Sequence, residues 1–526
     1  MVVFFLLGSA FLPHLGIQTD EALFIAGVYQ ADTVYYKIHI LGHSIPMMIS
    51  SYNGTLKSLL YAGLFRIFTP SAVSTRLPVQ LMGALTVWLF FLLLRRISGR
   101  WSAAAGALLL ATDTIFILTD TFDWGPVAIQ HLMLVGAMLS LYRYYETGKL
   151  TDLFWGFLML GLGMWDKALF IWSLTGIAIA ALATFPRTLI RLARPKPVGV
   201  ALLAFLLGAL PLVKFNWRTK GETFRSNAAW STANLWPKLL MAKGTAQGAF
   251  LFGYMVREDD PAETPPAPVD LPAKAAEHLS GWFGHPRTNL MLPALAGALL
   301  LTPLLLRART RAPRTMLFAA VALVVTWLAM ALNPNTGGSV HHIVLLWPLP
   351  HLLVAVAFGE AAQKFGRPGK AALATMLALV VGSNLLVTNE YYRMLRRNGG
   401  SVIWSDAVYP LSDFLRRVPS TQVMPIDWGF FDSLRLLNAG KLPLRGGVDP
   451  LNKPVLNAHD RENVRKWLDT SDTIFIDHTR ATEQFPGVSE HLQEVAQAAG
   501  FRRESLGVIP DGHGRAIYEV FRYIHP

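Results

Sequence analysis

Long apolar runs recur along the chain and are separated by short polar connections. Runs of about 18 or more apolar residues are long enough to cross a hydrocarbon layer roughly 30 Å thick, and they cover 77–94, 101–119, 168–185, 315–331 and 371–388. Backbone groups in lipid must pair within their own segment, so these runs predict helices. With the shorter apolar segments included, the pattern predicts a mainly α, polytopic bundle of about eleven transmembrane helices.

The pattern changes after residue 389. Helical periodicity at 406–417, 464–468 and 488–499 alternates with strand-like runs at 423–426, 473–476 and 516–521. Alternation of this kind predicts a small soluble α/β domain. We therefore expect a transmembrane domain over 1–388 and a C-terminal domain over 389–526.

Two polar segments interrupt the predicted bundle. The segment 17–76 is amphipathic and contains a helix-like run at 56–68, which is typical of helices that lie along the membrane interface. The segment 214–290 combines several tryptophans with a Pro-rich acidic stretch, which favours a large loop resting partly on the headgroups.

Composition and charge support a membrane location and give an orientation. Hydrophobic residues make up 52% of the 526 residues and charged residues 15%, whereas soluble domains carry about 25% charged residues. There is no cysteine, so disulfides and thiolate metal sites are excluded. Basic residues gather in alternate connections, which the positive-inside rule places in the cytoplasm: Arg95, Arg96, Arg100; Arg143, Lys149; Arg187, Arg191, Arg194, Lys196; Arg307, Arg309, Arg311, Arg314; Lys364, Arg367, Lys370.

The net charge of +13 is therefore mostly a signal of topology, and a nucleic-acid partner is not expected. The segments 17–76 and 214–290 and the C-terminal domain fall on the opposite face. We expect a multi-pass protein of the inner (plasma) membrane whose C-terminal domain lies on the external, or periplasmic, side.

Asp20 and Glu21 follow the first apolar segment directly, at the outer end of the membrane. A carboxylate in this position can accept a proton from an incoming hydroxyl. The alternative is a structural role, because Thr19 and Asp20 are both good helix N-caps.

A second acidic pair, Asp120 and Asp123, lies at the outer end of the third predicted helix. Pro126 fits the first turn of the next helix, so Asp123 is also a candidate cap. Because topology places this pair on the same face as Asp20, the carboxylates are candidates to share a proton or to hold a divalent metal ion.

Two basic motifs open onto the same face. Lys167 follows Asp166 at a helix end, where it either pairs with that neighbour, snorkels, or stabilises the charge of a departing phosphate. His341 and His342 begin a late helix and are candidates for a phosphate or acceptor contact, with solvated caps as the alternative. No carboxylate stands at metal-ligand spacing beside them, so a two-histidine zinc site is not expected.

The order of these motifs resembles the GT-C class of membrane glycosyltransferases. It is most similar to family 39, the branch of the protein O-mannosyltransferases and aminoarabinose transferases. The resemblance covers residues 17–185, and its motifs are Asp20-Glu21, 52–57, 76–78, 94–99, 120–126, and 161–163 followed by Asp166-Lys167. The chain departs from the pattern at His341-His342, where an Arg-Tyr pair often opens the helix.

The resemblance implies an inverting transfer of a sugar from a polyprenyl-phosphate donor to a hydroxyl on the external face. By the same resemblance Asp20 matches the catalytic base, and Asp123 matches a second acidic position, with Asp120 as the fallback. Lys167 matches the lysine that contacts the donor phosphate. Lys57, within the 52–57 motif, is a further candidate for substrate binding.

The sugar, the metal requirement and the acceptor (protein, lipid or glycan) stay open, and the expected partners are the lipid-linked donor and membrane lipids. The competing hypotheses are a polytopic secondary transporter and a non-catalytic membrane assembly protein. A transporter favours ionisable residues near the bilayer midplane and inverted repeats, whereas here the candidate groups lie at helix ends and no repeat is visible.

Overall fold

The computed structural model describes residues 1–30, 34–261, 266–268, 270–310 and 312–525. Five helical spans in this part of the chain are long and apolar enough to cross a membrane. They are α4 (Ala72–Ser98), α11 (Pro195–Arg218), α16 (Ala312–Ala331), the span Val340–Lys364 made of α17 (Val340–Ile343), η4 (Val344–Leu346) and α18 (Leu349–Lys364), and α19 (Gly366–Asn398). The protein is therefore a multi-pass membrane protein.

Two further spans are bent. The segment with α1 (Val2–Ser9) and η1 (Leu12–His14) meets α2 (Thr19–Ala26) and η2 (Gly27–Gln30) at 102°, and α5 (Arg100–Thr112) meets α6 (Thr114–Phe122) at 63°. Counting each bent pair as one span gives up to seven among the described residues. The predicted total of about eleven also includes α7 (Val127–Thr147), α8 (Leu150–Asp166), η3 (Ala168–Phe170) with α9 (Ile171–Thr184), and α15 (Met291–Arg307).

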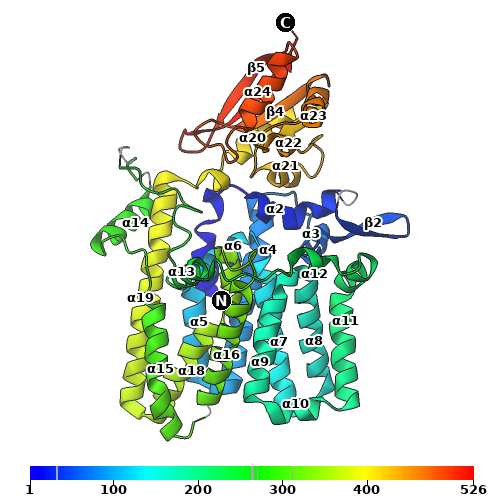
Figure 1. Cartoon of the computed structure of the whole chain (residues 1–526). Coiled ribbons are helices and arrows are strands. Elements are labelled where there is room, and N and C mark those ends of the chain that lie inside the picture. The colour runs from blue at the N-terminus through cyan, green and yellow to red at the C-terminus, as the bar shows by residue number, and fades with distance from the viewer. Residues whose placement is uncertain (31–33, 262–265, 269, 311, 526) are drawn as a thin grey trace.

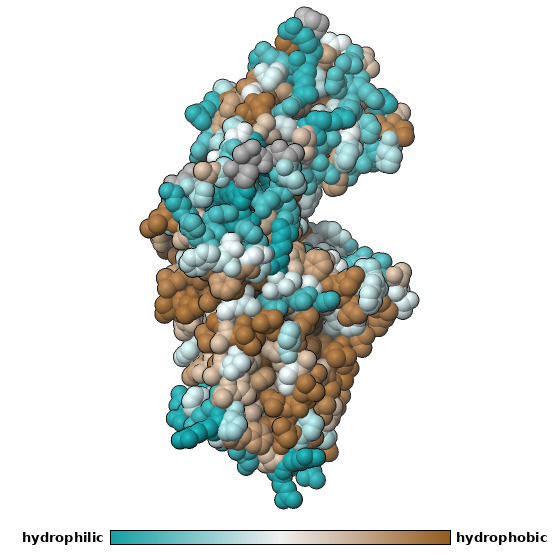
Figure 2. All heavy atoms as spheres, turned by 90° about the vertical axis from the view of Figure 1, so that its left-hand side faces the viewer, coloured by the Kyte–Doolittle hydropathy of each residue, from teal (hydrophilic) through white to brown (hydrophobic). Residues whose placement is uncertain are grey.

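The helices run side by side in the lower part of Figure 1. The outward side of α11 exposes leucines, among them Leu202 and Leu203, each 57% exposed. Figure 2 shows the same property as a hydrophobic band below a largely hydrophilic upper domain. An exposed apolar belt of this kind is the surface that lipid covers.

Small residues let the helices of the bundle approach closely. A Cβ atom on Gly161 of α8 would lie 2.2 Å from the carbonyl oxygen of Phe205, and one on Gly208 of α11 would lie 2.5 Å from that of Leu158. Any larger side chain would push these two helices apart. Close contact through small residues is a common way for membrane helices to associate.

The segment between η1 and α4 lies across one end of the bundle (Figure 1). It contains α2, α3 (Leu56–Leu64) and a hairpin of β1 (Tyr36–Ile40) with β2 (His43–Met48). The hairpin turns at Leu41 and Gly42, which both have positive φ. Leucine is unusual at such a turn, so the sequence carried no hairpin signal there.

The segment between α11 and α15 also contributes short helices at this end of the bundle (Figure 1). Its described part holds α12 (Glu222–Asn227), α13 (Leu235–Ala246) and α14 (Leu271–Trp282). Trp217, Trp230 and Trp236 are 83%, 73% and 67% exposed, respectively. Such exposed indole rings suit the headgroup level of a membrane. At the opposite end, α10 (Pro186–Leu192) connects α9 to α11.

The residues after α19 form an α/β unit with a four-stranded sheet in the order β3-β4-β6-β5. β3 (Gln422–Pro425) and β4 (Thr473–His478) are parallel, whereas β6 (Ala516–Ile524) pairs antiparallel with both β4 and β5 (Arg502–Pro510). Its helices are η5 (Val402–Trp404), α20 (Val408–Arg417), α21 (Phe431–Leu437), α22 (Val448–Leu451), α23 (Ala458–Leu468) and α24 (Val488–Ala498). The alternation of helices and strands was predicted, although β5 was not, and α19 runs past the expected boundary at residue 388.

The α/β unit is seated directly on α2. Leu436 of α21 packs in one apolar cluster with Ile17, Ala22 and Ile25. The Tyr409 hydroxyl donates to the carbonyl oxygen of Leu15 at 3.0 Å. The unit is therefore fixed to the bend between η1 and α2, close to the predicted site residues.

A buried ion pair holds this bend. Arg76 of α4 and Glu21 of α2 are 0% and 1% exposed. The Arg76 Nε lies 2.8 Å from the Glu21 Oε1, and the Nη2 lies 3.0 Å from the Oε2, so the contact is bidentate. The same guanidinium donates to the carbonyl oxygens of Leu12, Leu15 and Gly16, which the bend leaves without helical partners.

Replacing Arg76 by Met should destabilise the protein strongly. The substitution leaves the Glu21 carboxylate buried and unpaired, which costs about 3–5 kcal/mol. Thermal unfolding in detergent should show a marked fall in Tm for Arg76→Met, and part of the loss should return in the double variant Arg76→Met, Glu21→Leu. Additive losses in the double variant would contradict a coupled pair.

Candidate active site

The end of α2 that follows the bend presents Asp20. The helix is capped by Gln18, whose side-chain oxygen accepts the backbone N–H of Asp20 at 2.6 Å and that of Glu21 at 3.1 Å. The proposed capping role of Thr19 or Asp20 is therefore wrong, because Gln18 fills it. The Asp20 carboxylate is half-buried and forms no ion pair with a described residue.

The other acidic candidates are buried and already paired. Glu21 is bound to Arg76, as described above. Asp123 is 0% exposed, and its Oδ2 lies 2.8 Å from the Nζ of Lys57 on α3. Its Oδ1 also accepts the N–H of Ala128 in the first turn of α7, so the capping role considered for Asp123 is present as well.

Asp120 faces a histidine that sequence reasoning did not find. The His131 Nδ1 lies 3.0 Å from the Asp120 Oδ2, and its Nε2 lies 2.8 Å from the carbonyl oxygen of Val344. Both side chains are at most 1% exposed. The pair links α6, α7 and η4 beneath the candidate site and leaves the Asp120 carboxylate no open access to substrate.

Lys167 lies close to Asp20, although the two are far apart in sequence. Their charges interact, yet Lys167 forms no salt bridge with Asp20, Asp166 or any other described residue. The Lys167 Nζ lies 3.5 Å from the carbonyl oxygen of Gly125 and 5.6 Å from the centre of the Phe24 ring. The Lys167 side chain is only 4% exposed, so its ammonium group is a buried cation without an ion-pair partner among the described residues.

The backbone around Lys167 is held by the 52–57 motif. Asn53 forms a β-bridge with Lys167, and the Gly54 N–H donates to the carbonyl oxygen of Asp166 at 3.0 Å. A Cβ atom on Gly54 would lie 1.9 Å from the carbonyl oxygen of Trp165, so only glycine fits there. The motif that carries Lys57 therefore also fixes the position of Lys167.

His341 and His342 adjoin the same group. The Nδ1 of His341 accepts the indole N–H of Trp124 at 3.1 Å and lies 2.8 Å from the Ser339 hydroxyl. The two imidazole rings are 4.3 Å apart, and the Nδ1 of His342 has no partner among the described residues. The charge of Lys167 acts on both rings, which places them beside the ammonium group.

The C-terminal unit borders the site through α21. Its Asp432 pairs with Arg435 at 3.0 Å. Burial and, to a smaller extent, the negative charge of the nearby Asp20 raise the pKa of the Asp432 carboxyl to about 6, against the lowering effect of the Arg435 charge. Sequence reasoning missed this pair, because nothing in the chain order links α21 to α2.

A divalent metal ion at the converging carboxylates was one hypothesis. Among the described residues no group of three or more histidine, aspartate or glutamate side chains is arranged to hold one. The structure brings Asp20, Lys167, Asp123, Lys57 and the histidine pair to one end of the bundle, but its carboxylates are distributed among separate partners. The arrangement offers one partly accessible carboxylate, that of Asp20, and a buried ammonium group, that of Lys167, which forms no ion pair with a described residue.

The chain is similar to known proteins in two ways: part of its sequence matches a family model, and its fold matches solved structures. Residues 55–214 match the family model described as dolichyl-phosphate-mannose-protein mannosyltransferase. No curated protein sequence matches the chain.

Solved structures match nearly the whole chain. ArnT from Cupriavidus metallidurans, bound to undecaprenyl phosphate, superposes with a TM-score of 0.59 at 12% identity, covering 99% of this chain and 96% of that chain. Its apo state gives a TM-score of 0.58. The Archaeoglobus fulgidus oligosaccharyltransferase tethered to an acceptor peptide gives 0.50 at 12% identity, covering 100% of this chain and 73% of that chain. The chain therefore has the fold of the GT-C membrane glycosyltransferases, as the resemblance of residues 17–185 predicted.

Proposed function

We propose that the protein is an inverting glycosyltransferase that moves a sugar from a polyprenyl-phosphate donor to an acceptor hydroxyl. One observation carries the proposal. Asp20 is the one candidate carboxylate in the described structure that is partly accessible and unpaired, and it lies beside the unpaired ammonium group of Lys167. A base and a phosphate-binding cation are the two groups that this reaction needs.

The proposed step is a single displacement. The acceptor oxygen attacks the anomeric carbon, the bond from that carbon to the phosphate oxygen breaks, and Asp20 takes the hydroxyl proton. An alcohol is a weak nucleophile, so removal of its proton in the transition state accelerates the attack. Lys167 stabilises the negative charge that develops on the leaving phosphate.

The remaining charged residues have positioning roles in this proposal. Lys57 and Asp123 join α3 to the turn before α7, and this turn carries Gly125, the carbonyl partner of Lys167. Glu21 holds α2 through Arg76. His341 and His342 are placed for a contact to the phosphate or the acceptor, because they flank Lys167.

The donor class rests on the similar proteins. ArnT was solved with undecaprenyl phosphate, and the matching family is described by a dolichyl-phosphate-linked sugar. Undecaprenyl phosphate and dolichyl phosphate are both polyprenyl phosphates, and the second carries a sugar in the description of the family. The proposal takes this shared chemistry and leaves the sugar and the acceptor unassigned.

The proposal assigns the reaction to the external face, and cysteine labelling can test this assignment. The chain has no cysteine, so single cysteines report position directly. Val455→Cys, in the C-terminal unit and 77% exposed, should react with an impermeant maleimide on intact cells. Lys370→Cys, in a basic connection at the opposite end, should react only after permeabilisation. The reverse pattern would place the site on the cytoplasmic face.

Asp20→Asn should reduce turnover by about 10² to 10⁴ while leaving donor binding and Tm nearly unchanged. The amide keeps the size of the side chain but cannot accept the proton. Turnover of a radiolabelled polyprenyl-phosphate sugar by purified protein measures the loss. Asp413→Asn, the same change on exposed α20, is the matched control and should stay active. Full activity of Asp20→Asn would exclude Asp20 as the base.

Lys167→Met should weaken donor binding as well as turnover. A charge-assisted hydrogen bond to phosphate contributes about 1.5–3 kcal/mol, so the donor Kd should rise by about tenfold to a hundredfold. Lys167→Arg keeps the charge and should restore part of the binding. A loss of turnover with an unchanged donor Kd would instead give Lys167 a role in the transition state alone.

A further inference from the structure

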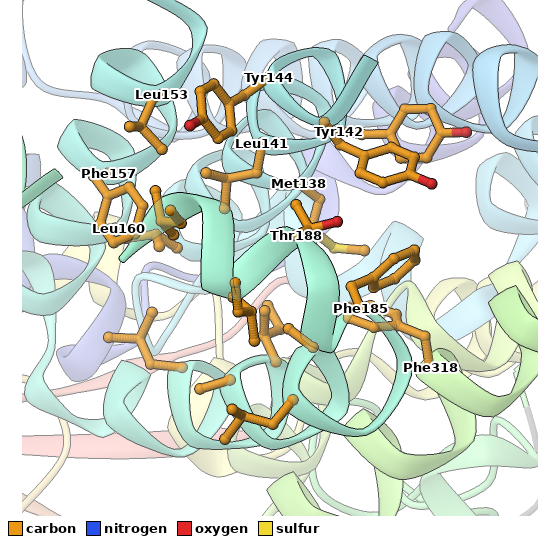
Figure 3. A pocket seen from close by; sticks show the side chains of 18 of the residues that line it. Met138, Leu141, Tyr142, Tyr144, Leu153, Phe157, Leu160, Phe185, Thr188 and Phe318 are labelled. Atoms are coloured by element: carbon orange, nitrogen blue, oxygen red, sulfur yellow. The ribbon is translucent and has the colours of Figure 1, made fainter. Parts of the chain in front are cut away.

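A large cavity lies inside the bundle at the end opposite the candidate site. Its volume is about 610 Å³, and apolar side chains from α4, α7, α8, α9, α10, α11, α16 and α18 line it (Figure 3). Leu93 and Ile97 come from the last turns of α4, and Tyr144 and Tyr145 from the last turns of α7. The connecting helix α10 contributes Thr188, Leu189 and Leu192 to its wall. None of the candidate catalytic or substrate-binding residues is among the lining residues.

The cavity is chemically unlike the candidate site. Its wall is formed by leucine, phenylalanine and other apolar groups, with only a few hydroxyls from tyrosine and threonine. Water gains few hydrogen bonds in such a space, whereas a hydrocarbon chain replaces the missing van der Waals contacts. The size falls within the range of small-molecule sites, about 300–1,000 Å³. In a membrane the most abundant ligand of this chemistry is a lipid chain.

Positive charge lies at the edge of the cavity. The Arg314 Nε donates to the carbonyl oxygen of Thr184 at 2.7 Å, and its guanidinium lies 4.6 Å from the centre of the ring of Phe185, a lining residue. Arg187 stands between the lining residues Phe185 and Thr188 on exposed α10. Neither arginine forms an ion pair with a described residue.

Two acidic side chains at this end are neutralised by arginines. Glu146 pairs with Arg96 at 2.9 Å, and Asp152 pairs with Arg143 at 3.1 Å. Glu360, in contrast, accepts a hydrogen bond from the Ser98 hydroxyl at 2.7 Å, next to the lining residue Ile97, and forms no ion pair with a described residue. Arg187 and Arg314 at the cavity edge outnumber this one unpaired carboxylate, so the charge balance at the edge favours an anionic headgroup. This end carries the basic connections that the sequence places at the cytoplasmic leaflet, where anionic lipids are concentrated.

We propose that the cavity binds an anionic phospholipid, with an acyl chain inside it and the headgroup phosphate beside Arg187 and Arg314. The proposal is independent of the glycosyltransferase function. The polyprenyl-phosphate donor is a poorer match for the edge, because its phosphate belongs beside Lys167 at the other end of the bundle.

Lipid retention tests the proposal directly. Purified full-length protein is reconstituted into vesicles of phosphatidylglycerol and phosphatidylcholine in equal amounts, extracted into mild detergent, and examined by native mass spectrometry. The wild type should retain phosphatidylglycerol in preference to phosphatidylcholine. Equal retention of the two lipids, or retention of an added polyprenyl phosphate in their place, would overturn the proposal.

Two matched pairs of variants separate the chain site from the headgroup site. Ala178→Trp fills the cavity from α9, whereas Ile179→Trp adds the same side chain at the next residue, which does not line it. Ala178→Trp should retain at least tenfold less lipid than the wild type, whereas Ile179→Trp should retain as much as the wild type. Equal retention by both would show that the lipid lies elsewhere.

The charge variants leave the cavity intact. Arg187→Gln with Arg314→Gln should lower the preference for phosphatidylglycerol about tenfold, whereas the control Arg225→Gln with Lys274→Gln removes two exposed charges near the other end and should keep it. An unchanged preference in the first double variant would refute the headgroup assignment even if Ala178→Trp fails to fold.

Discussion

The bidentate contact between Arg76 and Glu21 is the interaction on which the candidate site depends. Both groups are fully buried, so neither can lose its partner without a large desolvation cost. The same guanidinium collects three carbonyl groups at the bend before α2. This bend turns α2 across the end of the bundle, and the orientation of α2 in turn sets where Asp20 points and where α21 is seated.

The charged groups around Asp20 follow one rule. Lys57 is paired with Asp123, Arg76 with Glu21, and His131 with Asp120. A buried charge persists only when it is paired and hydrogen-bonded. Three groups at this end, Asp20, Asp166 and Lys167, form no ion pair with a described residue. Unpaired charges are typical of sites that receive their partner from a ligand.

The sequence predicted the depth of these residues but not their lateral contacts. Apolar runs and basic connections locate helix ends, and this was sufficient to place Asp20, Asp123 and Lys167 at one membrane face. It was not sufficient to pair Lys57 with Asp123, because depth does not determine which helices are neighbours. Likewise, Gln18 rather than Asp20 caps α2, since the choice between adjacent capping side chains depends on the backbone of the bend. The contact of α21 with α2 depends on the docking of a separate unit and carries no local sequence signal.

Charged groups are stabilised differently at the two ends of the bundle. At the α2 end the protein must keep several charged groups in an environment of low dielectric constant, and it does so by pairing most of them internally. Asp20 and Lys167 form no ion pair with a described residue, and of these two only Asp20 is partly accessible. At the α10 end the arginines stay at the surface, where water and lipid headgroups can solvate them, and an apolar cavity takes the space behind them. The first arrangement limits which polar group can enter, because any occupant must satisfy both unpaired charges. The arrangement at the α10 end requires only that an occupant has an apolar chain and a negative charge, and it does not fix the positions of polar atoms. The α2 end is therefore the end to which the proposed chemical step is assigned.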